Sequence, residues 1–421
     1  MNGGADLRGF LALLDQDLEA SSLAGFFVKA LGLHHVGRYS QSDEIAGDVV
    51  GFNLFGRQLI VLNSYEVAKD MLGNNASIYS DRPTMVWAGR LLGVEDSSVV
   101  LAPYGMEWRE RRAMLHQLMA RKSMTQFHGT LWEACLRILA DALENPLTFE
   151  GRLRLRLGGV ILKTTYGINV KGPEDHYLQI IEKFVKALNF NFFGRHLVDF
   201  FPILVYVPRS IPFAQFKKEA ESLGAIRKEL LNRSFEYALS QESLSLVNRL
   251  MLAGKNPDSV KLATGTLYTA GVDTTLVGIK AFLTAMMLNP EVQKKAQQEL
   301  DVVLGTSSKH EVLRFPTFDD QDNLPYLNAV IKEVHRWHPV LPLGVSHAPV
   351  EDDIYGGYFI PRDSIIMPNQ WAMSRDERHY PEPEEFRPER FLGDSPALDP
   401  KEFIFGFGRR QLFSAACTDL P

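Results

Sequence analysis

The sequence has 421 residues, a formal net charge of -6, 45% hydrophobic residues and 23% charged residues. These proportions are typical of a folded globular protein and argue against extensive disorder or a fibrous class. No long Lys/Arg block provides the basic surface that nucleic-acid binding needs, so the expected partner is a small molecule.

The two cysteines, Cys135 and Cys417, are too few for a disulfide framework or a four-cysteine zinc site. Cys135 lies in a helical pattern, where we expect a buried, inert thiol. Near the N-terminus, charged residues such as Asp6, Arg8 and Asp15 interrupt every apolar run. The sequence as written therefore predicts no transmembrane anchor.

Two β-rich runs between Asp48 and Ser64 surround a Phe-Gly-Arg turn and predict a hairpin. Ser64 is expected to cap a helix that runs to about Leu72. From Arg109 to Leu304 the apolar residues recur at helical spacing. Within that region Asn289 and Pro290 predict a new helix, with Asn as N-cap and Pro at the first helical position.

The segment 189–213 is rich in aromatic and branched apolar residues and is interrupted by prolines. It is either buried core with loops, or an apolar lid that rests on a membrane or lines a channel for lipophilic substrates. From Val345 to Met367 short strands are expected, with turns at Gly356-Gly357 and Pro361-Arg362. A loop rich in Pro and Glu follows at 379–394.

These patterns predict a mainly α fold with a small β region, in one domain over residues 1–421. We found no internal repeat and no linker that would divide it. The predicted parts are an N-terminal β-rich part at 48–64, a helical body at 65–340, a β and loop region at 345–410 and a tail at 411–421.

The first two of five short motifs lie in the helical body, upstream of residue 276. Trp108 and Arg112 are four residues apart and so share a helix face, an arrangement that alone indicates surface packing. The run AGVDTT, from Ala270 to Thr275, places glycine in an apolar helix at a cost of about 1 kcal/mol. Either a flat group approaches the backbone there, with Asp273 and Thr274 moving protons, or Gly271 permits tight helix packing.

The other three motifs lie toward the C-terminus. Glu333 and Arg336 form an acid-base pair three residues apart, flanked by apolar residues. Arg390, in the FRPERF segment, completes a triad with them if its loop folds back. The last motif, FGFGRR at Phe405 to Arg410, is by itself no more than a glycine-rich turn.

In this order, the five motifs resemble the signature set of the cytochrome P-450 family of haem-thiolate monooxygenases. The resemblance extends from about Asp48 to Arg410, and the connecting text, including YSDRP at 79–83, is similar to fungal members. It implies the cytochrome P-450 fold, incomplete at both ends, and haem b as cofactor.

The resemblance also implies a role for each matching residue. The propionate partners would be Trp108, Arg112, His347 and Arg410. Further cofactor contacts would come from Ala270 and Gly271 over the distal haem face, and from Phe405 and Gly408 in the haem loop. Asp273 and Thr274 would be catalytic, supplying protons for cleavage of dioxygen. Glu333, Arg336 and Arg390 would form a structural network.

The reaction implied is insertion of one oxygen atom from dioxygen into a lipophilic small molecule, with electrons from an NADPH-dependent reductase. The family also implies an endoplasmic reticulum location with a peripheral membrane contact. Without an anchor, the chain as written is predicted to be cytoplasmic.

One position departs from the family pattern. The axial cysteine is expected two residues after Arg410, where this sequence has Leu412, and Cys417 comes five residues later. Leucine has no donor atom for iron, so no metal ligand is predicted. The alternative is a catalytically inactive, truncated paralogue or gene-model fragment that acts at most as a binding protein.

Overall fold

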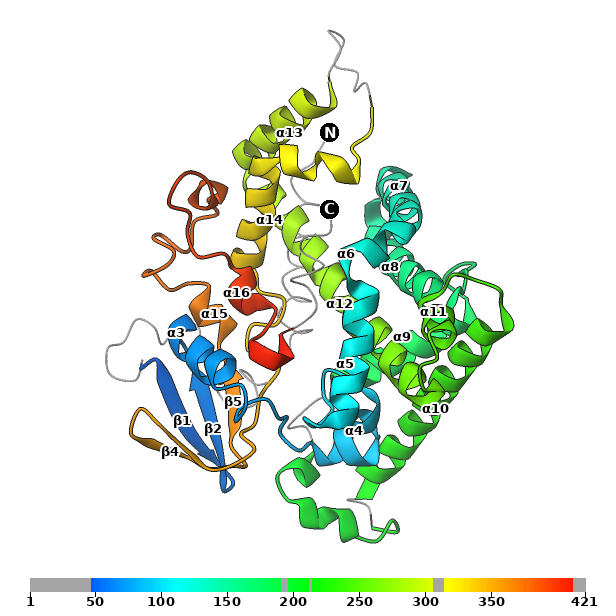
Figure 1. Cartoon of the computed structure of the whole chain (residues 1–421), viewed down its shortest axis with the longest axis vertical. Helices are drawn as coiled ribbons and strands as arrows, with labels where there is room; N and C mark the ends of the chain where they lie inside the picture. The colour runs from blue at the N-terminus through cyan, green and yellow to red at the C-terminus, as the bar shows by residue number, and fades with distance from the viewer. Residues whose placement is uncertain (1–46, 145, 191–195, 212–213, 306–313, 412–421) are drawn as a thin grey trace. The chain divides into compact units, whose positions relative to one another are not determined.

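The structure, a computed structural model, describes residues 47–144, 146–190, 196–211, 214–305 and 314–411 (Figure 1). The chain divides into two units. Unit 1 comprises Met1–Ser80 and Val277–Pro421, and unit 2 comprises Asp81–Leu276. Helices predominate in the described residues and the sheets are small, which confirms the predicted mainly α class.

The strands of unit 1 form a three-stranded sheet in the order β1-β2-β5 and a separate β3-β4 hairpin. They are β1 (Val49–Leu54), β2 (Arg57–Leu62), β3 (Asp353–Tyr355), β4 (Tyr358–Ile360) and β5 (Ile365–Pro368). The β1-β2 pair is antiparallel and β2-β5 is parallel. Phe55 and Gly56 turn the first hairpin with positive φ angles of 52° and 89°. The predicted hairpin between Asp48 and Ser64 is thereby confirmed, as are the short strands on either side of the predicted turn at Gly356-Gly357.

The helix after β2 is shorter than the sequence predicts. The Ser64 hydroxyl accepts a hydrogen bond from the Val67 N–H at 3.2 Å and so caps α3 (Tyr65–Ala68), as expected. Beyond Ala68 the chain winds more widely, as a π-helical segment over Lys69–Asn74. The segment passes the predicted end at Leu72 without the expected α-helical geometry.

Besides α3, the α-helices described in unit 1 are the end of α12 (Pro257–Leu288), α13 (Pro290–Leu304), α14 (Pro325–Trp337), α15 (Gln370–Met373) and α16 (Lys401–Ile404). Asn289 is the N-cap residue of α13 and Pro290 is its first residue, as predicted. The Asn289 amide, however, donates to the Ala285 carbonyl at 2.9 Å. The side-chain amide therefore satisfies a carbonyl at the end of α12. It makes no capping hydrogen bond to α13, although Asn289 holds the N-cap position.

The core of unit 1 lies between the sheet, α3 and the C-terminal loops. Its fully buried side chains include Leu62, Met71, Tyr79, Tyr380 and Phe403. A second cluster packs the last turns of α12 against α14, with Ala281 and Ala285 meeting Val330 and Val334. Segments more than 300 residues apart in sequence thus share one core.

The helices of unit 2 are α4 (Val94–Ser97), α5 (Met106–Met119), α6 (Arg121–Met124), α7 (His128–Glu144), α8 (Phe149–Tyr166), α9 (His176–Phe190), α10 (Gln215–Ser240), α11 (Leu246–Leu252) and α12 as far as Leu276. An ionic contact joins α7 to α8. Asp141 is 4% exposed and accepts from Arg156 Nε at 2.8 Å and Arg152 at 2.9 Å. The hydrogen bond from Arg156 is the largest cause that lowers the pKa of Asp141, outweighing its burial.

Cys135 corrects one prediction, since it is exposed on α7. The helix turns Asp141 toward α8 and exposes Leu139 and Leu143. The apolar residues of α7 therefore extend beyond the face that packs, and an apolar pattern alone placed the thiol on the wrong side.

Only part of segment 189–213 lies within the described residues, because 191–195 and 212–213 lie outside them. Its described part has two short 3-10 turns, Leu197–Asp199 and Pro202–Tyr206. Ile203 and Tyr206 are 74% and 85% exposed. Lys217 Nζ fastens the second turn by donating to the Val205 and Val207 carbonyls. The second turn is an outward-facing apolar surface, so the interpretation as buried core does not hold there. It does hold for Val198 in the first turn, which is 1% exposed.

Among the described helices, α12 is long and apolar enough to cross a membrane by length and composition. Buried helices of water-soluble proteins meet the same criterion, and Ala281 and Ala285 of α12 are fully buried against α14.

Candidate functional site

The FGFGRR motif forms a tight loop in unit 1 after α16. Gly406 and Gly408 have φ angles of 85° and 53°, a region that L side chains rarely adopt. A Cβ atom on Gly408 would lie 2.2 Å from the Leu72 carbonyl oxygen. Phe405 packs edge-to-face on His335, with ring centroids 5.8 Å apart. The loop geometry therefore requires glycine at position 408.

Two of the predicted propionate partners converge in unit 1. Arg410 Nε donates to the Ser80 carbonyl at 2.7 Å, and His347 Nδ1 lies 2.8 Å from the Tyr79 carbonyl. The two side chains are 6% and 2% exposed. The backbone of His347 is held independently by a two-way bridge to Ile366. Adjacent carbonyls thus anchor two buried basic side chains that are 63 positions apart.

The Glu333/Arg336/Arg390 network also lies in unit 1. Arg336 Nε and NH2 donate to the two Glu333 carboxylate oxygens, each at 2.8 Å, and both side chains are fully buried. Arg390 Nε lies 3.3 Å from the same carboxylate, and the Arg387 N–H donates to it at 2.8 Å. The loop does fold back, as the sequence analysis required for a triad.

The two arginines of this network also donate hydrogen bonds to the backbone carbonyls of the loop. Arg336 donates to the carbonyls of Ser374, Pro383 and Glu385, and Arg390 donates to those of Pro381, Glu382 and Glu385. Buried carbonyls need such partners because an unsatisfied one costs about 1–3 kcal/mol. These side chains therefore hold an irregular segment that has no strand ladder.

In unit 2, Trp108 and Arg112 share a face of α5, as their spacing predicts. The Arg112 guanidinium lies 5.4 Å from the centre of the Trp108 ring, and burial lowers the pKa of Arg112. The Trp108 indole N–H donates to the Val99 carbonyl at 2.9 Å. In this arrangement the buried Trp108 ring makes a cation–π contact with the Arg112 guanidinium.

The AGVDTT motif lies in the part of α12 that belongs to unit 2. A Cβ atom on Gly271 would lie 2.8 Å from Ile161 Cδ1 of α8, so the glycine permits close helix packing. The Thr274 hydroxyl donates to the Ala270 carbonyl at 2.7 Å. Of the two explanations for the glycine, the packing one has direct support.

Asp273 belongs to a polar network that the sequence analysis did not find. Arg154 NH1 of α8 lies 2.7 Å from Asp273 Oδ1 and 3.1 Å from Glu182 Oε2 of α9. The Tyr268 hydroxyl donates to Glu182 Oε1 at 3.3 Å. Burial alone would lower the pKa of Arg154, but Asp273 and Glu182 outweigh it and raise that pKa. No local sequence pattern links these positions, because they lie on three helices.

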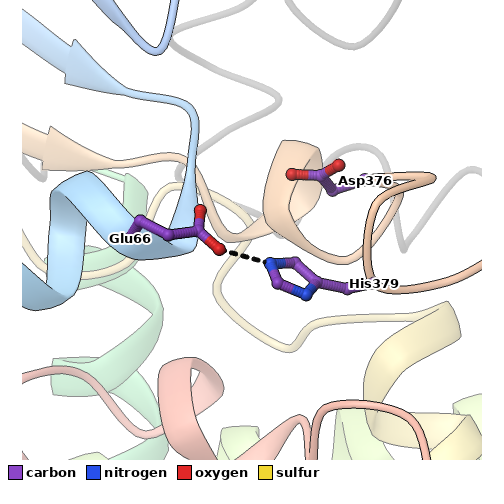
Figure 2. Close-up of side chains that lie close together, drawn as sticks. All are labelled: Glu66, Asp376 and His379. Carbon is purple, nitrogen blue, oxygen red and sulfur yellow. Dashed lines mark hydrogen bonds and ion pairs between the residues drawn. The ribbon is translucent and has the colours of Figure 1, made fainter.

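A separate group of potential metal ligands lies elsewhere in unit 1, where Figure 2 shows Glu66, Asp376 and His379. Their donor atoms lie within 4.8 Å of one another, and His379 Nε2 is 2.7 Å from Glu66 Oε1. Asp376, however, is paired with the Arg378 guanidinium at 2.7 Å. These contacts explain the group as a hydrogen bond between α3 and the loop after α15, with an ion pair inside that loop.

Two further positions singled out in the sequence are Leu412 and Cys417. Leu412, the expected axial position, and Cys417 both lie outside the described residues.

Comparison with solved structures defines the fold class. A zebra fish cytochrome P450 with progesterone aligns with a TM-score of 0.74 at 22% identity, covering 92% of this chain and 89% of that one. Another structure of a zebra fish cytochrome P450, with abiraterone, aligns at 0.70 and 21% identity over 92% of this chain and 88% of that one. At such identities the likeness shows the fold alone, which is the mainly α cytochrome P450 fold.

Sequence comparison adds the family. The cytochrome P450 family model matches residues 26–411. Cytochrome P450 monooxygenase COX2 of Coprinopsis cinerea is 36% identical over 391 residues, covering 88% of this chain and 73% of the relative. Cytochrome P450 monooxygenase claR of Ampulloclitocybe clavipes is 35% identical over 387 residues, covering 88% and 71%. The chain therefore belongs to the cytochrome P450 family.

Family membership brings haem iron as the cofactor and favours a haem-dependent monooxygenase over the inactive alternative. Unit 1 offers donors with the chemistry that the carboxylate groups of this cofactor need. They are His347 and Arg410, two buried basic side chains anchored at adjacent carbonyls. Buried carboxylates need such cationic and N–H donors.

Proposed function

We propose that this chain inserts one oxygen atom from dioxygen into a lipophilic small molecule, using electrons from an NADPH-dependent reductase. Bound haem would supply the oxygen-activating redox chemistry. The observation that carries the proposal is the family match together with the anchored pair His347 and Arg410.

Each predicted site residue keeps a proposed role. The propionates would be held by Arg112, His347 and Arg410. Trp108 would support this by packing its ring against the Arg112 guanidinium. The remaining cofactor contacts in the proposal are Ala270, Gly271, Phe405 and Gly408. The tight turn at Gly408 supports the last of these, because it fixes the course of the loop.

Asp273 and Thr274 would supply protons to the reaction. The Thr274 hydroxyl donates to the Ala270 carbonyl, so it would supply a proton only after rotating away from that carbonyl. Asp273 is 25% exposed and lies beside the Arg154 cation. A carboxylate that contacts both solvent and the protein interior is suited to proton transfer.

The exposed apolar turn Pro202–Tyr206 would make a peripheral contact with the endoplasmic reticulum membrane. Ile203 and Tyr206 are large apolar side chains on the surface, and Lys217 holds the second turn in place. Such an exposed apolar patch favours contact with a bilayer surface.

The test is haem binding by the full chain in two forms, the sequence as it stands and Leu412→Cys. Thiolate ligation gives the reduced, carbon monoxide-treated protein its characteristic absorption. We expect that band in Leu412→Cys, and weaker haem retention when His347→Leu or Arg410→Leu is added. Absence of haem binding in both forms would contradict the proposal.

A further inference from the structure

The Asp273 network contains one cation and two carboxylates. A single nitrogen, Arg154 NH1, contacts Asp273 Oδ1 at 2.7 Å and Glu182 Oε2 at 3.1 Å. Arginine keeps its proton at any physiological pH, so it holds the two carboxylates and does not relay protons between them. The two acids therefore compete for the same counter-ion.

Tyr268 fixes one side of this competition. It is 3% exposed, and burial followed by the charge of Glu182 raises its pKa, so its hydroxyl stays protonated and donates to Glu182. A Cβ atom on Gly158 would lie 2.7 Å from the Tyr268 hydroxyl, so the lack of a side chain at Gly158 allows the Tyr268 ring to pack against α8. Glu182 is thereby held within reach of Arg154.

Solvent reaches the network on the α9 side. A pocket of about 460 Å³ is lined by Glu182 together with Leu178, Gln179, Lys183 and neighbours on α9. The Glu182 side chain is only 15% exposed, against 28% for Arg154. Glu182 and Arg154 are therefore both partly open to solvent.

We propose that Glu182, oriented by Tyr268, is a positioning residue that shares Arg154 with Asp273 and so sets how firmly the Asp273 carboxylate is held. The inference rests on the proposed role of Asp273 as a proton donor. With Glu182 present, Asp273 shares its counter-ion and can turn. Without Glu182, Arg154 pairs with Asp273 alone and immobilises it.

Double-mutant cycles test the sharing without any cofactor. Urea unfolding of the full chain is measured for Arg154→Gln, Asp273→Asn and the double variant, first in the native background and then with Glu182→Gln. We expect the Arg154–Asp273 coupling, expressed as a ratio of unfolding constants, to rise about twofold or more when Glu182 is neutralised. An unchanged or smaller coupling overturns the proposal.

Two further backgrounds sharpen the result. Glu174→Gln makes the same charge change at an exposed position just before α9 and should leave the coupling unchanged. Tyr268→Phe removes only the hydroxyl and should raise the coupling by less than Glu182→Gln. An equal rise with Glu174→Gln would mean a general charge effect and would refute the sharing. If Arg154→Gln does not fold, Arg154→Lys replaces it in the same cycle.

The same variants separate this inference from the proposed function. In haem-loaded protein, Glu182→Gln should increase hydrogen peroxide released per NADPH consumed and enlarge the solvent isotope effect. If the cycles show sharing but Asp273→Asn leaves peroxide release unchanged, the role of Asp273 fails and the sharing stands. If Asp273→Asn raises peroxide release while the cycles show no sharing, the positioning role of Glu182 fails.

Discussion

Neutralising Glu333 should strongly destabilise unit 1. Glu333→Gln keeps the shape of the side chain but leaves the fully buried Arg336, and Arg390 at 3% side-chain exposure, without their counter-charge. Breaking a buried pair in this way costs about 3–5 kcal/mol. The expected loss is therefore a large fraction of the stability of an ordinary domain.

The assay is urea unfolding of the full chain followed by circular dichroism, with Glu389→Gln as the matched control. Glu389 lies in the same loop and pairs with Lys295 at 2.6 Å, but the two side chains are 40% and 56% exposed. Such an exposed pair contributes about 0–1 kcal/mol. Equal losses in the two variants would refute the reasoning from burial.

A second comparison tests what the arginines do. Replacing the pair together, as Glu333→Gln with Arg336→Met, removes the uncompensated charge of Arg336, and in many proteins that restores stability. Here we expect no recovery, because the buried Arg390 stays without a counter-charge and Arg336 also donates to three loop carbonyls. Full recovery would show that the carbonyl bonds contribute nothing.

Three further outcomes are expected. Gly408→Ala should lower the free energy of unfolding by several kcal/mol, against about 1 kcal/mol for Gly254→Ala. Both glycines have positive φ, but of the two only Gly408 has a carbonyl oxygen where its Cβ atom would lie. Similar losses of stability in the two variants would refute the contact argument. Arginine hydrogen bonds lower the folded-state pKa of Asp141, so its stabilisation should be present above about pH 4 and disappear as pH falls through that lowered pKa. The stability gap between wild type and Asp141→Asn should accordingly narrow in acid, and a constant gap would contradict this. Ile203→Ser with Tyr206→Ser should weaken sedimentation with anionic lipid vesicles at unchanged melting temperature, whereas unchanged sedimentation would exclude this turn as the contact.

The sequence predicted those parts of the molecule that local rules control. The Phe-Gly turn fixed the register of the first hairpin, because Phe55 and Gly56 at positive φ permit a tight two-residue connection. The spacing of Glu333 and Arg336 places both on one helix face, and their apolar flanks indicated burial. These features depend on residues a few positions apart.

The remainder depended on partners far away in the chain. Asp273 was expected to be a proton donor, yet nothing near it in sequence revealed Arg154 or Glu182, which come from two other helices. Cys135 has the same apolar neighbours as a buried residue, but α7 packs through a different face. Helical periodicity shows that a helix has an apolar side without showing which neighbour covers it.

The loop that carries Arg390 has a consequence for the order of folding. Its carbonyls are satisfied by guanidinium groups, one of which belongs to α14, about 50 residues earlier in the chain. Such long-range contacts form only after the intervening chain has closed, so this loop should order late, after α14 has docked. Interactions absent from the transition state mainly govern the unfolding rate. Substitutions in the loop should therefore shorten the lifetime of the folded protein while leaving its folding rate nearly unchanged.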